Sequence, residues 1–516
     1  MSLNQLFAKK SLKVLLEEMA GENRLRRVLG PVTLTSLGVG AIIGTGIFVL
    51  VGKAAAQQAG PALMLSFVAS GITCIFAALC YAEFASMAPV AGSAYTYSYA
   101  TMGELFAWII GWDLVLEYAI GASTVAHGWS HYFQDFLKLV SRGAWVWPKT
   151  WGDAPFEFLP RTGTMQLSGS YVDLPAIFIA TLVTVVLVIG IRESAGFNAT
   201  MVILKVTIVL FVICVGAFLI NPANWTNNFA PHGYGGLSIP FLTSGPIGGQ
   251  PTGMLAGAAT IFFAYIGFDS ISTHSEEAKN PQRDVPTGII ASLLICTVLY
   301  ILVSGILTGM VPYDKINIDA PVSDAFTQRG FDFAALLISA GAVAGITSVL
   351  LVMMLSQPRV LLAMARDGLL PQSFFGAIHP RFRTPWKSTI LTGVLVGTAA
   401  ALLPLDILAD MVNIGTLLAF LMVCAAVLIM RRLNPGAHRP FRAPFVPFVP
   451  IAGIVSCLIL MLSLGVQNWA RLGIWLAIGL VIYFTYGRWH SHLGKELRAE
   501  ISTHGISPAG VPVDGV

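Results

Sequence analysis

Glycines interrupt an apolar run near the N-terminus at the depth where that run would cross the middle of a membrane. The run extends from Gly38 to Phe48, with Gly44-Thr45-Gly46 in its second half. A membrane helix can break only where its freed backbone groups line a polar cavity or meet a ligand. We therefore predict two half-helices, the second of which directs the N–H groups of Thr45, Gly46 and Ile47 and its positive dipole end at an anion. A bound carboxylate would satisfy these groups.

A second apolar run, 252–275, contains a matching interruption at Gly267 and Asp269. Paired interruptions in the two halves of a chain point to a transporter site between inverted repeats. The alternative for the first run is close helix packing, since Gly40 and Gly44 have the spacing of a packing motif. Unwinding would free the carbonyl groups of Ile42, Phe263 and Ile266 to hold an ammonium group. A carboxylate at the amide end and an ammonium at the carbonyl end describe an α-amino acid.

Ionisable side chains within apolar runs are costly in a membrane, so each is a candidate functional residue. Lys205 lies too deep to reach the surface easily, and burial disfavours the charged amine, so we predict that it couples transport to protons. Its alternative role is a fixed cation that joins the first and eighth apolar runs. Glu117, one turn after Asp113, either draws a cationic side chain into the cavity or bonds to a neighbouring helix. Asp269 is interpreted as a cap for the second half of its run or an internally paired acid, and contact with the ligand is the alternative.

Three further side chains are candidates for selecting the substrate side chain together with Glu117: Phe268, Ser348 and Asn413. Glu83, near the end of the apolar run at 62–86, is interpreted as a gate or packing residue.

The elements that position these residues are membrane helices. The chain has 516 residues, 55% hydrophobic and 11% charged, and its mean hydropathy is +0.75, whereas soluble proteins carry roughly 25% charged residues. Apolar runs of about 20 residues, the length that a bilayer requires, recur twelve times. We therefore predict an all-α integral membrane protein with twelve transmembrane helices, at 33–51, 62–86, 100–133, 172–191, 194–220, 252–275, 287–311, 331–364, 388–404, 407–430, 446–467 and 471–487.

The placement of charge predicts the orientation. An even number of crossings puts both termini on one side, and Lys and Arg concentrate in the segments on that side, which predicts cytoplasmic termini in the cell membrane. Residues 11–20 form a predicted amphipathic helix on the membrane surface. Two long loops, 134–171 and 221–251, are predicted external caps, in which Trp145, Trp147 and Trp151 act as interfacial anchors or loop core.

Several classes of chemistry are not expected. The six cysteines all lie in apolar runs, so we expect no disulfide framework. His127, His131 and His274 show no metal spacing with nearby acids or cysteines, so we expect no metal site. No nucleotide-binding Walker sequence occurs. We expect no cofactor, no nucleic-acid partner and no enzyme activity; the membrane lipid, protons and a small solute are the expected partners.

Several motifs resemble those of a known family, in the same order along the chain. They are Gly40-Ala41-Ile42-Ile43-Gly44-Thr45-Gly46-Ile47-Phe48, Tyr81-Ala82-Glu83-Phe84 with Pro89 to Tyr99, Arg192-Glu193-Ser194-Ala195 with Asn198, Phe262 to Asp269 with Glu276 to Arg283, and Gln357-Pro358-Arg359 with Met364 to Pro371. The chain thus resembles the cationic amino acid transporters of the amino acid-polyamine-organocation superfamily. The likeness covers roughly 29–442.

The resemblance implies a five-plus-five inverted repeat with discontinuous helices one and six and two further C-terminal helices. The corresponding segments are 1–30 (cytoplasmic), 31–220 (first repeat), 251–431 (second repeat), 446–487 (helices eleven and twelve) and 488–516 (cytoplasmic tail). The substrate-binding residues that it implies are Ile42, Ile43, Gly44, Thr45, Gly46, Phe263, Ala264 and Ile266. Lys205 aligns with a lysine that replaces a sodium ion in proton-coupled relatives.

The expected activity is proton-coupled import of L-amino acids, cationic and/or small neutral, by alternating access. Animal members of the family generally have fourteen spans, so twelve spans suggest a bacterial member and leave the preference for cations open. The alternatives are an amino acid exchanger and an amino acid sensor that does not transport.

Overall fold

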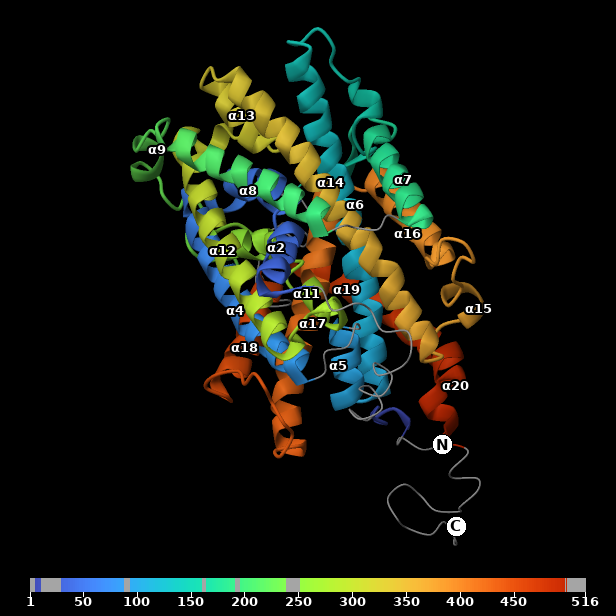
Figure 1. The fold of residues 1–516 in the computed structure, drawn as a ribbon. Helices are drawn as coiled ribbons and strands as arrows, with labels where there is room; N and C mark the ends of the chain where they lie inside the picture. Colours follow the sequence, from blue (N-terminus) through green and yellow to red (C-terminus); the bar gives the residue numbers. More distant parts are fainter. Residues whose placement is uncertain are drawn as a thin grey trace, which may run out of the picture.

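The computed structural model describes residues 5–10, 29–87, 93–159, 164–190, 195–237, 251–496 and 498, and these are mostly helical (Figure 1). The predicted amphipathic helix at 11–20 and most of the tail at 488–516 lie outside the described residues.

Eight stretches of the described chain are long and apolar enough to cross a membrane. They are Gly46–Met87, Glu104–Val140, Thr200–Ala217, Met254–Ser272, Pro281–Met310, Asp332–Arg366, Leu405–Leu433 and Val466–His490. Four shorter apolar helices accompany them: Pro31–Ile42, Leu174–Ile189, Trp386–Leu402 and Phe448–Leu462. Each of the twelve predicted apolar runs falls on one or more of these helices.

The main helices have the following bounds: α2 Pro31–Ile42, α4 Leu63–Met87, α6 Glu104–Val140, α7 Leu174–Ile189, α8 Ala195–Ala217, α10 Met254–Ile261, α12 Pro281–Met310, α14 Asp332–Arg366, α16 Trp386–Leu402, α17 Leu405–Leu433, α18 Phe448–Leu462 and α19 Val466–Ile482.

Shorter helices connect them: α3 Val51–Ala54, α5 Ser93–Thr101, α9 Ala223–Thr226, α11 Ser270–Thr273, α13 Pro321–Gln328, α15 Gln372–Phe375 and α20 Arg488–His490. Wide π-helical turns occur at Gly46–Leu50, Ala55–Ala59 and Tyr483–Gly487. Tight 3₁₀ turns occur at Gly60–Ala62, Lys149–Trp151, Phe262–Tyr265, Ser275–Glu277 and Tyr313–Lys315. An antiparallel hairpin of β1 (Phe156–Leu159) and β2 (Thr164–Leu167) lies in the connection between α6 and α7.

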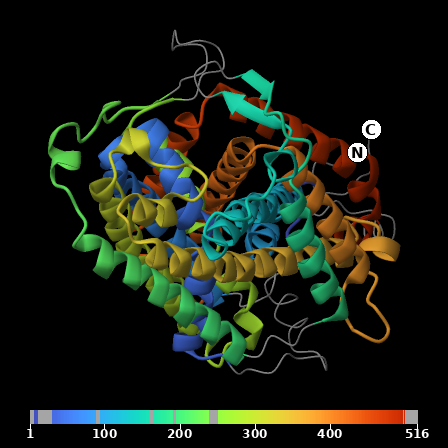
Figure 2. The same ribbon diagram turned by 90° about the horizontal axis from the view of Figure 1, so that it is seen from above.

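Helix α6 lies near the centre of the bundle in the view from above (Figure 2). It packs along α14 and α17 and also contacts α5, α7 and α16, while α12 packs against α2 and α4. Small residues allow the closest approaches: a Cβ atom on Gly111 of α6 would lie 2.9 Å from the sulfur of Met364 in α14. The candidate residues on α6 are thus enclosed by neighbouring helices.

The first and last described segments meet at one end of the bundle, drawn at the bottom of Figure 1. Leu105 N–H at the start of α6 donates to Leu6 O (3.1 Å), and Gln5 Nε2 donates to Arg488 O of α20 (2.8 Å). This agrees with an even number of crossings. Because α6 begins here, its connection to α7 lies at the opposite end.

Candidate functional site

The first apolar run is broken where the sequence predicts. Helix α2 ends at Ile42, and Ile43 is extended, with φ −73° and ψ 104°. The chain becomes helical again at Gly46–Leu50, and the N–H groups of Ile47 and Phe48 both donate to Gly44 O at 3.2 Å. The prediction that the Ile47 amide faces a ligand is therefore wrong, because this N–H group donates back to Gly44 O within the first turn. Thr45 and Gly46 remain in the first turn, where helix N–H groups lack intrahelical partners.

Thr45 places a second polar group at this break. Its side chain is 1% exposed, and its hydroxyl oxygen has no hydrogen-bond partner among the described residues. Helix α6 packs directly on it, because a Cβ atom on Gly128 would lie 2.5 Å from Thr45 Cγ2. A buried unpaired hydroxyl is costly, so its position beside the first-turn amides favours a polar ligand here.

The second apolar run is also broken as predicted. Helix α10 ends at Ile261, the tight turn Phe262–Tyr265 follows, and Ile266 is extended with ψ 136°. Gly267 has φ +117°, a conformation that strongly favours glycine. Helix α11 starts three residues later.

The two breaks lie side by side. A Cβ atom on Gly46 would lie 2.3 Å from Ala264 Cα, and one on Gly267 would lie 2.9 Å from Ala41 O. Glycine at these two positions is therefore what allows the two unwound segments to meet. The structure brings together the predicted binding residues of both runs, which are all buried: Ile42, Ile43, Gly44, Thr45, Gly46, Phe263, Ala264 and Ile266.

Two of the three carbonyl groups predicted to hold an ammonium already accept hydrogen bonds. Tyr300 Oη on α12 donates to Ile42 O at 2.8 Å, and Ile266 N–H donates to Phe263 O at 3.2 Å. The prediction that unwinding leaves these oxygens free is wrong, although each carbonyl oxygen can accept a second bond. Tyr300 is a contact that the sequence analysis missed, since nothing in the pattern of α12 marks it.

Three buried carboxyl groups lie near one another, two on α6 and one in the second break. Asp113 and Glu117 are each 1% exposed on α6, and Asp269 is fully buried in the second break. Tyr118 Oη donates to Asp269 Oδ2 at 3.1 Å, and Glu117 lies within electrostatic range of both other acids. Both oxygens of Asp113, Glu117 Oε1 and Asp269 Oδ1 have no hydrogen-bond partner among the described residues. Buried carboxylates are normally paired, so this group favours a cation.

The remaining side-chain candidates have mainly structural contacts. Phe268 packs its ring against Tyr81 and Phe420, with ring centroids at 6.0 Å and 5.0 Å. Asn413 on α17 donates from Nδ2 to Ala259 O and to Thr260 O, each at 3.0 Å. Asn413 therefore binds the last carbonyl groups of α10, a role that the sequence analysis did not foresee. Ser348 Oγ bonds within its own helix, to Gly345 O at 3.2 Å.

Lys205 joins three helices at the end of α2. It lies on α8 and is fully buried, and its Nζ donates to Gly40 O at 2.6 Å. Gly345 of α14 packs against its stem, where a Cβ atom would lie 3.2 Å from Lys205 Cγ. The predicted contacts with the first and eighth runs are present. The amine thus holds the backbone two residues before the end of α2.

Ion pairs lie at both ends of the bundle. Glu83 at the end of α4 accepts two hydrogen bonds from Arg431 of α17, from Nε at 3.0 Å and Nη2 at 2.6 Å. At the opposite end, Lys53 Nζ lies 2.6 Å from Asp406 Oδ1, at the start of α17. Each pair connects the first half of the chain to the second.

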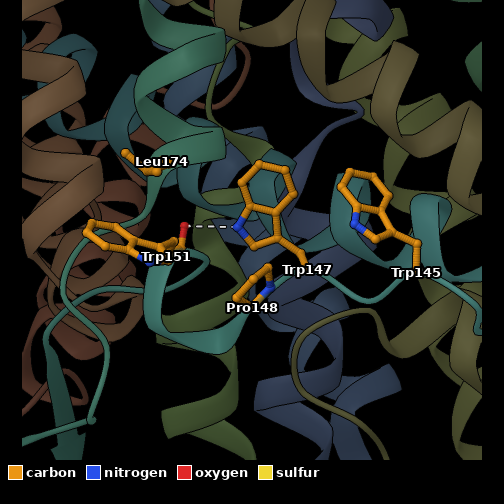
Figure 3. Close-up of a pocket in the computed structure, with 5 residues that line it drawn as sticks. All are labelled: Trp145, Trp147, Pro148, Trp151 and Leu174. Atoms are coloured by element: carbon orange, nitrogen blue, oxygen red, sulfur yellow. Dashed lines mark hydrogen bonds between the residues drawn. The ribbon is translucent and has the colours of Figure 1, made fainter.

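The connection between α6 and α7 forms an apolar hollow of about 380 Å³, shown in Figure 3. Its lining residues are Trp145, Trp147, Pro148, Trp151 and Leu174. Trp147 Nε1 donates to Trp151 O at 3.0 Å, the dashed line in Figure 3. Trp145 and Trp147 also contact each other, with ring centroids 5.8 Å apart, yet Trp145 and Trp151 remain 51% and 43% exposed, so contacts within the loop do not bury them.

The same connection overturns one expectation about the histidines. His127 and His131 show no metal spacing with acids along the sequence, but the folded connection brings Asp153 to both of them, at 3.6 Å and 3.8 Å. Sequence spacing missed this group because the loop folds back over α6.

Comparisons with known proteins agree with this geometry. Residues 29–484 match the family described as amino acid permease. Two proteins of Bacillus subtilis (strain 168) are each 45% identical to the chain. One is named methylthioribose transporter, and the match covers 96% of this chain and 100% of that protein. The other is named branched-chain amino acid permease BcaP, with 95% and 99% covered.

A human protein named cationic amino acid transporter 4 is 32% identical, over 98% of this chain and 94% of its own. A match over most of the chain, together with relatives of this similarity and coverage, shows the family. The chain belongs to the amino acid permease family.

Proposed function

We propose that the protein is a proton-coupled symporter that imports L-amino acids, cationic and/or small neutral, by alternating access. It would lie in the cell membrane with both termini cytoplasmic, and its twelve crossings would form a five-plus-five inverted repeat followed by two further helices. The observation that carries the proposal is the pair of broken helices that meet at Gly46 and Ala264, where a Cβ atom on Gly46 would lie 2.3 Å from Ala264 Cα.

The carboxylate of the substrate would bind at the start of the second half of the first broken helix. The N–H groups of Thr45 and Gly46 belong to the first turn, and the hydroxyl of Thr45 has no partner among the described residues. Amide groups at a helix N-terminus and its dipole both favour an anion. Main-chain contacts of this kind recognise any α-amino acid.

The ammonium group would bind at the carbonyl end of the breaks. Ile266 is extended and directs its backbone out of the helix, and the carbonyl groups of Ile42 and Phe263 each retain a second acceptor position. Asp269 lies in the same turn and adds negative charge.

The substrate side chain would be selected by the acids on α6. Glu117 and Asp113 lie one turn apart on α6, and both have carboxylate oxygens without a hydrogen-bond partner among the described residues. Phe268 packs its ring against Tyr81. A lysine or arginine side chain would supply the cation that these buried carboxylates lack. A neutral side chain would be accepted only if one of the acids is protonated.

Lys205 would couple the cycle to protons. Its amine donates to Gly40 O, two residues before the end of α2. A protonated amine makes a stronger hydrogen bond than a neutral one. Gain and loss of a proton would therefore tighten and loosen the segment that leads into the first break.

Alternating access also needs gates that open in turn. The pairs Glu83–Arg431 and Lys53–Asp406 connect the two halves at opposite ends of the bundle. One pair would separate in each half of the cycle.

A second candidate substrate has its own support. A relative that is 45% identical over its whole length is named a methylthioribose transporter, and this compound lacks the two charged groups of an amino acid. Because methylthioribose lacks these charged groups, comparing it with amino acids tests whether the site recognises them.

The test is uptake into proteoliposomes that contain the purified protein. A panel of labelled L-amino acids and methylthioribose is supplied with and without an imposed pH gradient, inside alkaline. The proposal expects accumulation of one or more amino acids that collapses with a proton ionophore. Gradient-independent exchange with preloaded substrate would replace the symporter by an exchanger. Binding without uptake would indicate a sensor, and uptake of methylthioribose alone would refute the amino acid assignment.

A further inference from the structure

Two histidines on α6 and one aspartate of the following connection form a cluster at the end of the bundle opposite the described termini. His127 and His131 are one turn apart, so they share a face of the helix, and their ring centroids lie 4.7 Å apart. One nitrogen from each ring and a carboxylate oxygen of Asp153 all lie within 4.8 Å of one another.

The distances suit a small divalent ion. Asp153 Oδ1 lies 3.6 Å from His127 Nε2 and 3.8 Å from His131 Nε2. Zinc binds imidazole nitrogen and carboxylate oxygen at about 2.1 Å in a tetrahedral site, which puts neighbouring ligand atoms about 3.4 Å apart. The two distances from Asp153 Oδ1 therefore lie within a few tenths of an ångström of the spacing expected for ligands of one ion.

The other nitrogen of each ring lies near a second carboxylate, although His131 Nδ1 makes no hydrogen bond to a described residue. His127 Nδ1 lies 3.2 Å from Asp173 Oδ2, and His131 Nδ1 lies 3.4 Å from Asp319 Oδ1. Histidines that bind metals almost always give their free ring nitrogen to a carboxylate, a carbonyl or water, which fixes the ring and its tautomer. His127 Nδ1 also lies 3.1 Å from the carbonyl oxygen of Ala400. Both rings thus present Nε2 to Asp153.

The outer groups are themselves held in place. Asp173 is fully buried, and its Oδ1 accepts hydrogen bonds from Ser130 Oγ at 2.6 Å and from Ala176 N–H at 3.0 Å, at the start of α7. Gln134 Nε2 donates to Ser130 Oγ at 3.0 Å and to Gly152 O at 2.7 Å. Gln134 therefore ties the residue before Asp153 to α6, and the tryptophans of Figure 3 pack in the same loop.

We propose that His127, His131 and Asp153 bind a divalent transition-metal ion of the zinc class. Two imidazoles and one carboxylate are a ligand set that such ions favour, and three protein ligands leave a fourth position for water. Magnesium and calcium prefer oxygen ligands, so the two nitrogens discriminate against them.

The cluster lies close to the first break, so a bound ion would affect transport. This part of the inference rests on the proposed function. Gly128, next to His127, packs against Thr45 in the first break, and Tyr132, next to His131, donates from Oη to Phe48 O at 2.8 Å. The bound ion would join α6 to its connection with α7, and the outer carboxylates reach α7 and the segment after α12. Binding would thus restrain this end of the bundle and slow uptake.

The binding test uses the full chain, purified in detergent and freed of metal with a chelator. Isothermal titration with zinc chloride should show one site per chain. His131→Ala and Asp153→Asn should each weaken zinc binding at least about tenfold, because each removes one of the three ligands. His232→Ala, at an exposed histidine outside the cluster, is the matched control and should bind as the unchanged protein does.

The outcomes separate the alternatives. Bound cobalt should give the visible absorption of a tetrahedral site in the unchanged protein and lose it in Asp153→Asn, a substitution that keeps side-chain size. No zinc binding, or equal binding by His131→Ala and Asp153→Asn, would overturn the site and leave an ion-paired histidine cluster. Zinc that binds here without slowing uptake would refute only the restraint on transport. The zinc titration measures binding in detergent and involves no transport. Its outcome therefore tests the metal site even if the symport proposal fails.

Discussion

Replacing Lys205 separates the proton-coupling role from that of a fixed cation. Lys205→Met keeps an unbranched apolar stem against Gly345 of α14 but removes the amine that donates to Gly40 O at 2.6 Å. Lys205→Ala removes both. We expect gradient-driven uptake to disappear in both variants, while substrate binding persists at reduced affinity.

The size of the loss in binding follows from the carbonyl that is left behind. A buried acceptor without its donor costs about 1–3 kcal/mol. If the whole cost falls on the conformation that binds substrate, affinity decreases about 5- to 150-fold. Lys205→Met should lie at the lower end of this range, because it leaves no cavity beside Gly345.

The assay is uptake by proteoliposomes at fixed substrate concentration, with and without an inside-alkaline gradient, together with substrate-dependent thermal stabilisation. Ile203→Ala, on the exposed side of α8, is the control and should retain both signals. Undiminished gradient-driven uptake by Lys205→Met would remove the amine from the coupling mechanism. Residual uptake that is lower but still rises with the gradient by the same ratio as in the unchanged protein, together with full substrate binding, would assign Lys205 a purely structural role.

Three further substitutions test other parts of the site. Gly46→Val places a side chain where even a Cβ atom would lie 2.3 Å from Ala264 Cα. It should abolish substrate binding and lower the free energy of unfolding by about 1–3 kcal/mol through overpacking. Normal ligand-dependent thermal stabilisation of this variant would count against the site. Glu117→Gln should weaken competition by arginine and lysine against a labelled substrate about tenfold or more relative to competition by leucine, since hydrogen bonds to charged groups contribute about 1.5–3 kcal/mol. Equal losses for all three amino acids would show that Glu117 does not contact the substrate side chain. Glu83→Gln removes the charge paired with Arg431 and should lower the free energy of unfolding by about 1–3 kcal/mol, given that Arg431 is partly exposed. A thermal-shift assay should therefore show a lower melting temperature, and an unchanged one would make the pair dispensable for stability.

The two breaks could be predicted from sequence because backbone requirements dictate them. Only glycine readily adopts the φ of +117° at Gly267, and only a glycine at position 46 lets the two unwound segments meet. Hydropathy located the helices for a similar reason, since a bilayer sets the length of an apolar run.

Contacts between distant helices were not predictable in this way. Tyr300 binds Ile42 O, and Asn413 binds the last carbonyl groups of α10, yet both residues lie in apolar helices without any motif. Asp153 reaches His127 and His131 only because its loop folds back over α6. In each case the partner is chosen by three-dimensional packing, which residue spacing along one segment does not encode.

Binding of substrate analogues tests the central claim most directly, namely that two broken helices hold the charged ends of an amino acid through their backbone groups. The measurement is competition against a labelled L-amino acid by its methyl ester, which lacks the carboxylate, and by its deaminated analogue, which lacks the ammonium. Each charged group removed should cost about 1.5–3 kcal/mol, a loss of about tenfold or more in affinity. Equal competition by the parent amino acid and both analogues would contradict the account.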